Sequence, residues 1–340
     1  MMALSSRWCA QNVAEVTLVR VYVPPMRTKL FLAIVIGLCF AGSFLARWRM
    51  GPTPGDRAAP TRASRIVSLA PSVTETLFAV GLGDRVVGVT RFCAYPPGVA
   101  SLPKVGGYHD PNFEAIVRLR PDLVVMLVEH QWLLPAFSKL GLNSLVVNHK
   151  TIDGVLESLP LLGEASGRQE LEQALRIRGD MVRRLDRVRD TTAGLARPRV
   201  MFSIDRILGT GGLESVYIAG PDGFFDTMIE LAGGQNAFQG KGVRFPVVSS
   251  EGILRIDPEV IIDMVSGMAH ARPDEATLKA DWQQLARVDA VRNGRVYVVA
   301  EPYAFVPGPR VVLLVEKLAR LIHPEVSWPE VSWPEVDLQP

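Results

Sequence analysis

The segment Glu114-Ala-Ile-Val-Arg-Leu-Arg-Pro121-Asp-Leu-Val-Val125 has a counterpart later in the chain, Glu251-Gly-Ile-Leu-Arg-Ile-Asp-Pro258-Glu-Val-Ile-Ile262. In both, a Glu stands seven residues before a Pro, and an acidic residue and an aliphatic run follow that Pro. Apolar residues at helical spacing before the Pro, and β-branched residues after it, predict a short helix that leads into a buried strand. Two such units far apart in the sequence predict two lobes of similar construction.

The composition is that of a globular chain with room for two domains. It has 340 residues, of which 48% are hydrophobic and 21% charged. Its 37 basic and 35 acidic residues give a net charge of +2, and no basic run is interleaved with aromatic residues. We therefore expect no nucleic-acid partner. Only Cys93 lies within the predicted folded body, so no internal disulfide is expected there.

The N-terminal segment carries an export signal. The basic segment Met26-Arg-Thr-Lys29 precedes an uncharged run from Leu30 to Leu45, which predicts a signal peptide over residues 26–46. The run is shorter than the roughly 20 apolar residues of a membrane-spanning helix, but a membrane anchor and a buried helix remain alternatives. Residues 1–25 are interpreted as a start-site artefact, because Met26 begins the better signal. The Pro- and Gly-containing residues 47–64 predict a flexible tether.

The N-terminal lobe is predicted over residues 65–167. A strand at Ile66–Leu69, a helix that ends at Gly81-Leu82-Gly83 and a strand at Val86–Val89 form a βαβ unit, which indicates a parallel sheet. Two further strands are predicted at Leu123–Leu127 and Ser144–Val147.

A linking helix is predicted over residues 168–197. Apolar residues recur at helical spacing from Leu171 through Leu175 to Val188, and seven arginines are expected on the other faces. A helix of about 25 residues would be roughly 38 Å long. It would be either an ordinary surface helix or a strut between lobes. The strut is favoured, because the strand-like segment Val200–Ile204 resumes the alternation of strands and helices directly afterwards.

The C-terminal lobe is predicted over residues 198–323, and the chain as a whole is predicted to be α/β, with two lobes, each a mainly parallel sheet with helical cover, joined by one long backbone helix. The expected elements of this lobe are a strand at Val200–Ile204, a helix at Gly223–Leu231, the Glu251 unit, a helix around Trp282–Val288, a strand at Val296–Ala300 and a helix at Arg310–Leu321. Residues 324–340, which contain a tandem Glu-Val-Ser-Trp-Pro duplication, are predicted to be a disordered tail.

Catalytic and metal-binding patterns are not recognisable, so no catalytic residue, metal ligand or cofactor is assigned. Gly209-Thr-Gly-Gly212 lacks a phosphate-loop pattern and is interpreted as a connecting loop. The spacing of His109, His130 and His149 specifies no metal site, although their convergence in space remains open. For an enzyme, His109 with Glu301 is the pair to check.

Aromatic residues in loops are the better candidates for ligand binding, because ligands of parallel α/β sheets bind at the carboxyl ends of strands, often in aromatic sites. The alternative is that each ring packs within its own lobe. Tyr108 and Phe245 each precede their Glu by six residues, so both lobes would present a ring to one cleft. The candidates are Phe92, Tyr95, Tyr108, Phe245, Tyr303 and Phe305.

Several motifs resemble those of the helical-backbone (class III) periplasmic binding proteins, the receptors of ABC importers for ferric siderophores, haem and vitamin B12. The resemblance spans about residues 65–323, and residues 92–97, Phe-Cys-Ala-Tyr-Pro-Pro, look most like the B12-binding branch. Tyr108 and Phe245 depart from that branch, in which Trp is often found. The motifs are Arg65-Ile-Val-Ser-Leu-Ala-Pro-Ser-Val-Thr-Glu-Thr-Leu77, Tyr95-Pro-Pro97, Pro103-Lys-Val-Gly-Gly107, Pro121-Asp-Leu-Val-Val125, Asn293-Gly-Arg-Val-Tyr297 and Pro307-Gly-Pro-Arg310.

The resemblance implies a monomeric, periplasmic or extracytoplasmic receptor that captures a corrinoid or ferric chelate in an interlobe cleft. It implies delivery to the permease and ATPase subunits of an ABC importer, with Glu114 and Glu251 docking onto permease arginines. Phe92, Tyr108 and Phe245 fall near the family's ligand aromatics. The alternatives are a haem receptor, in which Tyr108 would ligate the iron, a chelatase-like enzyme, and a membrane-anchored sensor.

Overall fold

The computed structural model describes residues 62–209, 212–221, 223–265 and 273–329. The predicted start-site artefact and signal segment, most of the tether and the second copy of the tail repeat lie outside these residues. No helix in the described part of the chain is both long and apolar enough to cross a membrane. The last residues of the predicted tether are held in place: Ala63 is buried and its N–H donates to the carbonyl of Ala165, while Ser64 donates to Asp122.

The first sheet is wholly parallel, as the strand–helix–strand pattern predicts. Its order is β2-β1-β3-β4, so the carboxyl ends of all four strands lie at one edge. Phe92 lies in the loop that leaves this edge after β2, and Leu127 is the last residue of β3. The strands are β1 (Ile66–Ser68), β2 (Val86–Val89), β3 (Leu123–Leu127) and β4 (Ser144–Val147).

The helices around this sheet are short, apart from α5. Helix α2 is the one whose residues line the cavity described below. Pro71 opens α2, where its missing N–H costs no hydrogen bond. The rest of α2 is buried, including Glu75, which is 5% exposed. The elements are α2 (Pro71–Ala79), α3 (Phe113–Arg118), α4 (Leu134–Lys139), α5 (Ile152–Glu164), and the 3-10 turns η1 (Gly83–Arg85), η2 (Pro97–Ser101) and η3 (Val128–Leu133).

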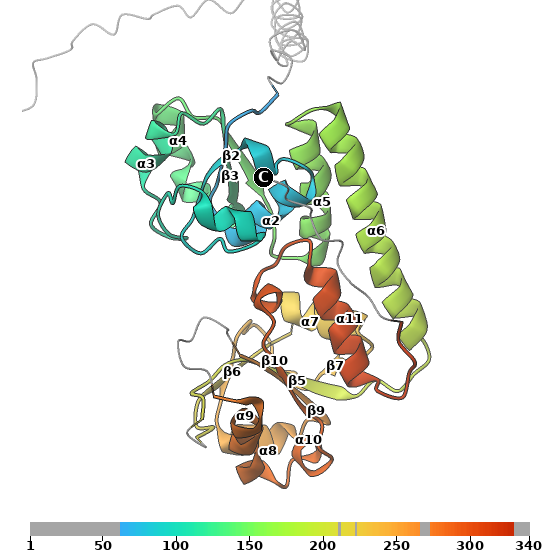
Figure 1. Ribbon diagram of the computed structural model, residues 1–340. Helices are drawn as coiled ribbons and strands as arrows, with labels where there is room; N and C mark the ends of the chain where they lie inside the picture. The colour runs from blue at the N-terminus through green and yellow to red at the C-terminus, as the bar shows by residue number, and fades with distance from the viewer. Residues whose placement is uncertain (1–61, 210–211, 222, 266–272, 330–340) are drawn as a thin grey trace, which may run out of the picture. The chain divides into compact units, whose positions relative to one another are not determined.

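Helix α6 (Arg168–Thr192) is a single helix of 25 residues that follows the first sheet and precedes the second. It packs along α5 and then against α11 (Figure 1), and one hydrophobic core includes residues from all three helices. Arg184 departs from the expectation that the arginines of this helix lie on faces other than the buried one. Arg184 is buried and forms a two-bond ion pair with Glu316 of α11, Nε to Oε1 at 2.9 Å and Nη2 to Oε2 at 2.7 Å. Leu175, predicted on the apolar face, is 51% exposed.

The second sheet combines parallel and antiparallel pairings. Strand β5 pairs in parallel with β9 and β7, and β10 with β9, whereas β6 runs antiparallel to β5 and β8. The strand order is β10-β9-β5-β6-β8. The strands in the described residues are β5 (Arg199–Asp205), β6 (Val216–Ile218), β7 (Gln235–Asn236), β8 (Val247–Val248), β9 (Val260–Met264) and β10 (Val296–Val299).

The helices of the second part agree with the expectations except near Trp282. A helix was expected around Trp282–Val288, but α9 ends at Trp282. The reason is its N-cap: the side chain of Asp274 accepts a hydrogen bond from the N–H of Thr277 at 2.7 Å and starts the helix earlier. The elements are α7 (Phe224–Leu231), α8 (Ser250–Ile256), α9 (Glu275–Trp282), α10 (Asp289–Arg292), α11 (Val311–Ile322), η4 (Gln283–Leu285) and η5 (Pro302–Phe305).

The first copy of the tail repeat is not disordered, contrary to the prediction for residues 324–329. The indole Nε1 of Trp328 donates to the carbonyl of His323 at 3.0 Å, and Arg320 donates to the carbonyl of Pro329. The Trp328 ring also packs against the core. The repeat therefore satisfies a carbonyl left free by the end of α11 and covers apolar surface.

Candidate functional site

A cavity of about 500 Å³ lies between the carboxyl edge of the first sheet and the segment that precedes α11. The start of α2, the loop after β2 and the end of β3 form one wall, and η5 with the residues up to Arg310 forms the other. Four of the predicted ligand aromatics line it: Phe92, Tyr95 and Tyr108 on the first wall, and Phe305 on the second. The structure thus brings together three rings from positions 92 to 108 and a fourth from position 305.

The other two predicted aromatics do not line this cavity. The ring of Tyr303 lies 5.5 Å from the guanidinium carbon of Arg310, on the second wall. Phe245 is 49% exposed and precedes β8 at the antiparallel edge of the second sheet. The shared offset of Tyr108 and Phe245 from their Glu residues therefore does not give the two rings the same placement.

An ion pair joins the two walls. The guanidinium of Arg310 donates from Nε to Glu75 Oε2 at 2.9 Å and from Nη2 to Glu75 Oε1 at 2.5 Å. The ring of Tyr95 lies 3.7 Å from the guanidinium carbon, a cation–π distance. Burial raises the pKa of the Glu75 carboxyl, while the hydrogen bonds and charge of Arg310 act in the opposite direction.

Sequence reasoning assigned no role to this pair, although a signal was present. Glu75 is the only charged residue of the α2 segment Pro71–Ala79, and Arg310 directly precedes the apolar start of α11. A lone charge beside an apolar helix face is rarely buried unless it has a partner. That pattern indicates that Glu75 has a buried partner, but it does not identify Arg310 as that partner.

Tyr108 sits among histidines at the first wall. Its ring makes edge contacts with His109 and His130, at centroid distances of 4.8 and 4.5 Å. Burial, with a smaller contribution from the charge of Glu129, raises the pKa of Tyr108 to about 12. His130 is buried and its pKa is lowered, mainly by that burial. Both groups are therefore neutral at neutral pH and offer polar atoms without net charge.

His149 supports the wall from behind. Its Nδ1 is 2.9 Å from the hydroxyl of Ser72, which lines the cavity, and its Nε2 is 2.9 Å from the hydroxyl of Ser158. Burial lowers its pKa to about 4. Both nitrogens are thus engaged in the core.

Within the described residues, no group of three or more His, Cys, Asp or Glu side chains could hold a metal ion.

The remaining chemical candidates are held in structural contacts. Glu301 accepts hydrogen bonds from Lys317 and from the N–H of Ala300, and in the described residues none joins it to His109. The N–H of Gly209, the first residue of the predicted connecting loop, donates to Asp281 at 2.8 Å, while Thr210 and Gly211 lie outside the described residues.

Glu114 and Glu251 have matching surroundings. Each lies in the first turn of a short helix whose N-cap side chain, Asn112 for α3 and Ser249 for α8, accepts a backbone hydrogen bond. The two carboxylates are 82% and 83% exposed and pair with an arginine four residues later, Arg118 at 2.7 Å and Arg255 at 3.0 Å. The acids were predicted from the sequence, but their pairing with these arginines was not. Exposed pairs of this type contribute little stability, so the carboxylates remain accessible to a partner.

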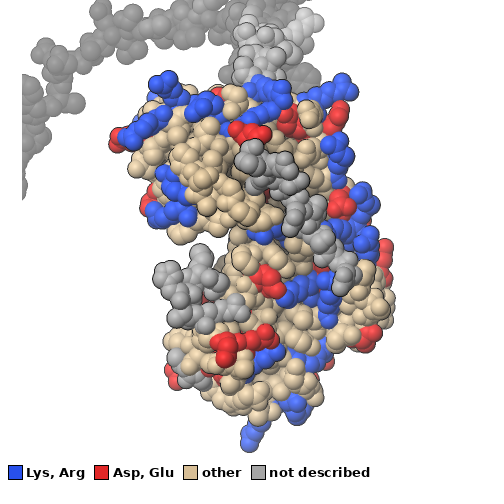
Figure 2. Space-filling model, viewed as in Figure 1, with Lys and Arg blue, Asp and Glu red and all other residues tan. Residues whose placement is uncertain are grey.

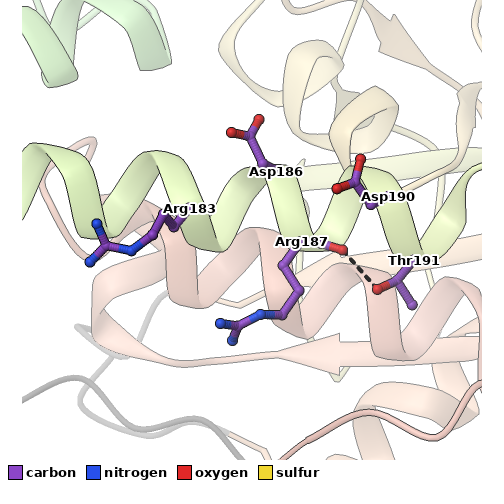
Figure 3. A pocket seen from close by; sticks show the side chains of 5 residues that line it. All are labelled: Arg183, Asp186, Arg187, Asp190 and Thr191. Carbon is purple, nitrogen blue, oxygen red and sulfur yellow. Dashed lines mark hydrogen bonds between the residues drawn. The ribbon is translucent and has the colours of Figure 1, made fainter.

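A second hollow lies on the outer surface of α6 (Figure 3). Arg183, Asp186, Arg187, Asp190 and Thr191 line it, and the Thr191 hydroxyl donates to the carbonyl of Arg187 at 2.7 Å. All five residues come from one helix, and acids and bases are interspersed along this edge in Figure 2. It lacks the apolar, concave lining of ligand sites, which favours the cavity between the first sheet and the segment that precedes α11.

Comparison with known proteins gives a consistent result. The model of the periplasmic binding protein family matches residues 66–303. The chain is 29% identical over 274 residues to a vitamin B12-binding protein of Vibrio cholerae, covering 78% of this chain and 91% of that one. It is 31% identical over 269 residues to a cobalamin-binding protein of Halobacterium salinarum, covering 76% and 69%.

Solved structures show the same fold. The periplasmic vitamin B12-binding protein of Vibrio cholerae superimposes with a TM-score of 0.63 at 27% identity, covering 76% of this chain and 96% of that one. A periplasmic haem-binding protein from Roseiflexus has a TM-score of 0.63 at 24% identity, covering 77% and 98%. At this lower identity, the similarity to the haem-binding protein shows only that the two chains share a fold.

Proposed function

Because the chain belongs to the periplasmic binding protein family, we propose that it is an extracytoplasmic receptor that captures a corrinoid and delivers it to an ABC importer. The family consists of substrate-binding proteins rather than enzymes, and its fold is present here. The observation that supports the proposal best is the cavity of about 500 Å³ with three aromatic rings on one wall and a fourth on the other.

The chemistry of the cavity suits a flat metal chelate. The faces of such a macrocycle are apolar, and rings at Phe92, Tyr95 and Phe305 would cover them. The rim of a corrinoid carries amides, which need hydrogen-bond partners but no counter-charge. The hydroxyls of Tyr95 and Tyr108 can supply such partners. The relatives that bind vitamin B12 or cobalamin support this ligand class.

Ligand capture is tested with the purified full-length chain and cyanocobalamin. We expect a Kd in the micromolar range or tighter, measured by calorimetry and by quenching of tryptophan fluorescence. Phe92→Ala should weaken binding by roughly tenfold, because stacking on an aromatic ring contributes on the order of 1 kcal/mol or more. Trp132→Ala, which removes an exposed ring outside the cavity lining, serves as the control. No binding of cyanocobalamin would overturn the proposal.

Delivery is assigned to Glu114 and Glu251, whose exposed carboxylates would meet basic groups of a permease. Charge reversal at both positions, Glu114→Lys with Glu251→Lys, should abolish stimulation of the transporter and leave ligand affinity unchanged. The control is Glu172→Lys, because Glu172 also belongs to an exposed pair on a helix, with Arg168. Undiminished transport by the double variant would refute the docking role.

Haem is the second candidate ligand, and Tyr108 is the observation that favours it. A phenol at the cavity wall beside two histidines can coordinate ferric iron once it is deprotonated. Titration with ferric haem should then give a charge-transfer absorbance that Tyr108→Phe abolishes. If haem binds without this signature, Tyr108 is not a ligand of the iron.

A further inference from the structure

Charge at the cavity wall is confined to one pair of residues. Among the described residues that line the cavity, only Glu75 and Arg310 are ionisable to a full charge at neutral pH. Their side chains are 4% and 11% exposed. Each oxygen of the carboxylate receives one of the two guanidinium bonds, so the Nε–Nη2 edge of Arg310 is occupied in a geometry that it would otherwise offer to a ligand carboxylate.

Two aromatic rings also lie near the guanidinium of Arg310. The ring of Tyr95 lies 3.7 Å from its central carbon, and that of Tyr303 lies 5.5 Å away. Both distances are within cation–π range, and Glu75 binds the Nε–Nη2 edge. Two of the five N–H donors of Arg310 are therefore committed to Glu75, and that carboxylate neutralises the charge of the guanidinium.

Neighbouring charges in the described residues are also paired outside the lining. Arg91, whose guanidinium carbon lies 5.1 Å from the Phe92 ring, pairs with Asp110 at 3.0 Å. Glu129 pairs with Lys150 at 3.6 Å, and Glu301 with Lys317. The described wall is thus electrically neutral, although it contains an arginine.

We propose that the Glu75–Arg310 pair determines specificity by removing the cation from the cavity wall, so that the site selects chelates whose rim is uncharged. This inference rests on the proposed function and narrows it: a corrinoid, with amides at its rim, is accepted over an analogue that carries a free carboxylate. A ligand carboxylate would enter an apolar site without a counter-charge and would lie near the Glu75 carboxylate. Burying an unpaired charge in this way is costly.

The matched probes are cyanocobalamin and its three monocarboxylic acids, the b, d and e isomers, in which one rim amide is replaced by a carboxylate. For the natural chain at pH 7.5, calorimetry should show cyanocobalamin binding about tenfold or more tightly than at least one of the acids, the fold-change of an unpaired charged group. Glu75→Gln exposes the charge of Arg310 and should reverse this preference. Glu75→Gln with Arg310→Gln restores neutrality and should restore the preference.

A second measurement keeps the inference testable if Glu75→Gln does not fold. Ferric haem and its dimethyl ester differ only in their two carboxylates, so the natural chain should bind the ester about tenfold or more tightly. Equal binding of cyanocobalamin and all three acids, or tighter binding of haem than of its ester, would overturn the inference. Either result leaves chelate capture intact, whereas a failure of cyanocobalamin itself to bind refutes the proposed function and the inference with it.

Discussion

His149 should make the stability of the protein depend on pH. Burial lowers its pKa from the ordinary value of 6.5 to about 4, and its two nitrogens contact hydroxyls rather than charges. The unfolded chain therefore binds a proton between pH 6.5 and 4 that the folded chain excludes. Stability is fully present above pH 6.5 and is lost as the pH falls through this window.

The magnitude follows from the two values. The full shift of about 2.5 units corresponds to roughly 3 kcal/mol at 1.36 kcal/mol per unit, reached near pH 4. Between pH 7.5 and pH 5.0 the same two values give a loss of about 2 kcal/mol. This is a large fraction of the 5–15 kcal/mol typical of a folded domain.

Urea unfolding at pH 7.5 and at pH 5.0 measures this loss. In His149→Gln, whose amide can still meet Ser72 and Ser158, the difference in unfolding free energy between the two pH values should be smaller than in the natural chain by about 2 kcal/mol. His109→Gln, a substitution at an exposed histidine, should leave the difference unchanged. If His149→Gln retains the whole pH dependence, then another group is responsible and the assignment is wrong.

Two further predictions concern stability. Arg184→Met leaves Glu316 buried without its partner and should lower the free energy of unfolding, measured by urea titration, by about 3–5 kcal/mol. Arg184→Met with Glu316→Met should recover most of the lost stability. An unchanged midpoint in the single variant would show that the pair contributes nothing. Gly220→Ala places a Cβ atom 1.9 Å from the carbonyl oxygen of Val243 and should cost about 1–3 kcal/mol, seen as a lower Tm. The control is Gly179→Ala, at a helical site with only a flexible side chain nearby, which should not lower the Tm; an unchanged Tm in Gly220→Ala would contradict the prediction.

The strands were the most predictable part of the fold. Leu123–Leu127 and Ser144–Val147 have the ends that the sequence predicts, because strands of a buried parallel sheet are continuous aliphatic runs. The helix near Trp282 was misplaced, because the apolar residues of α9 do not form a clear helical pattern and its start is set by the cap at Asp274. The antiparallel edge formed by β6 and β8 was likewise not predicted, because those strands are only three and two residues long.

The site was predictable in its aromatic residues but not in its charges. Loop rings after strands of a parallel sheet indicate the binding edge, and Phe92, Tyr95 and Tyr108 are found there. The Glu75–Arg310 pair joins residues 235 positions apart, and local spacing carries no information about such a contact. Phe245 shows the converse, because an offset repeated along the sequence does not fix the same position in space.

The contacts of Trp328 bear on which deletions in the tail the protein can tolerate. The two copies of Glu-Val-Ser-Trp-Pro are identical, at 325–329 and 330–334, and deleting either yields the same protein sequence. His323 and Pro324 would still be followed by the five residues that reach the carbonyl of His323 and the guanidinium of Arg320. Deletion of one copy would therefore leave the contact intact. Loss of both copies would remove it.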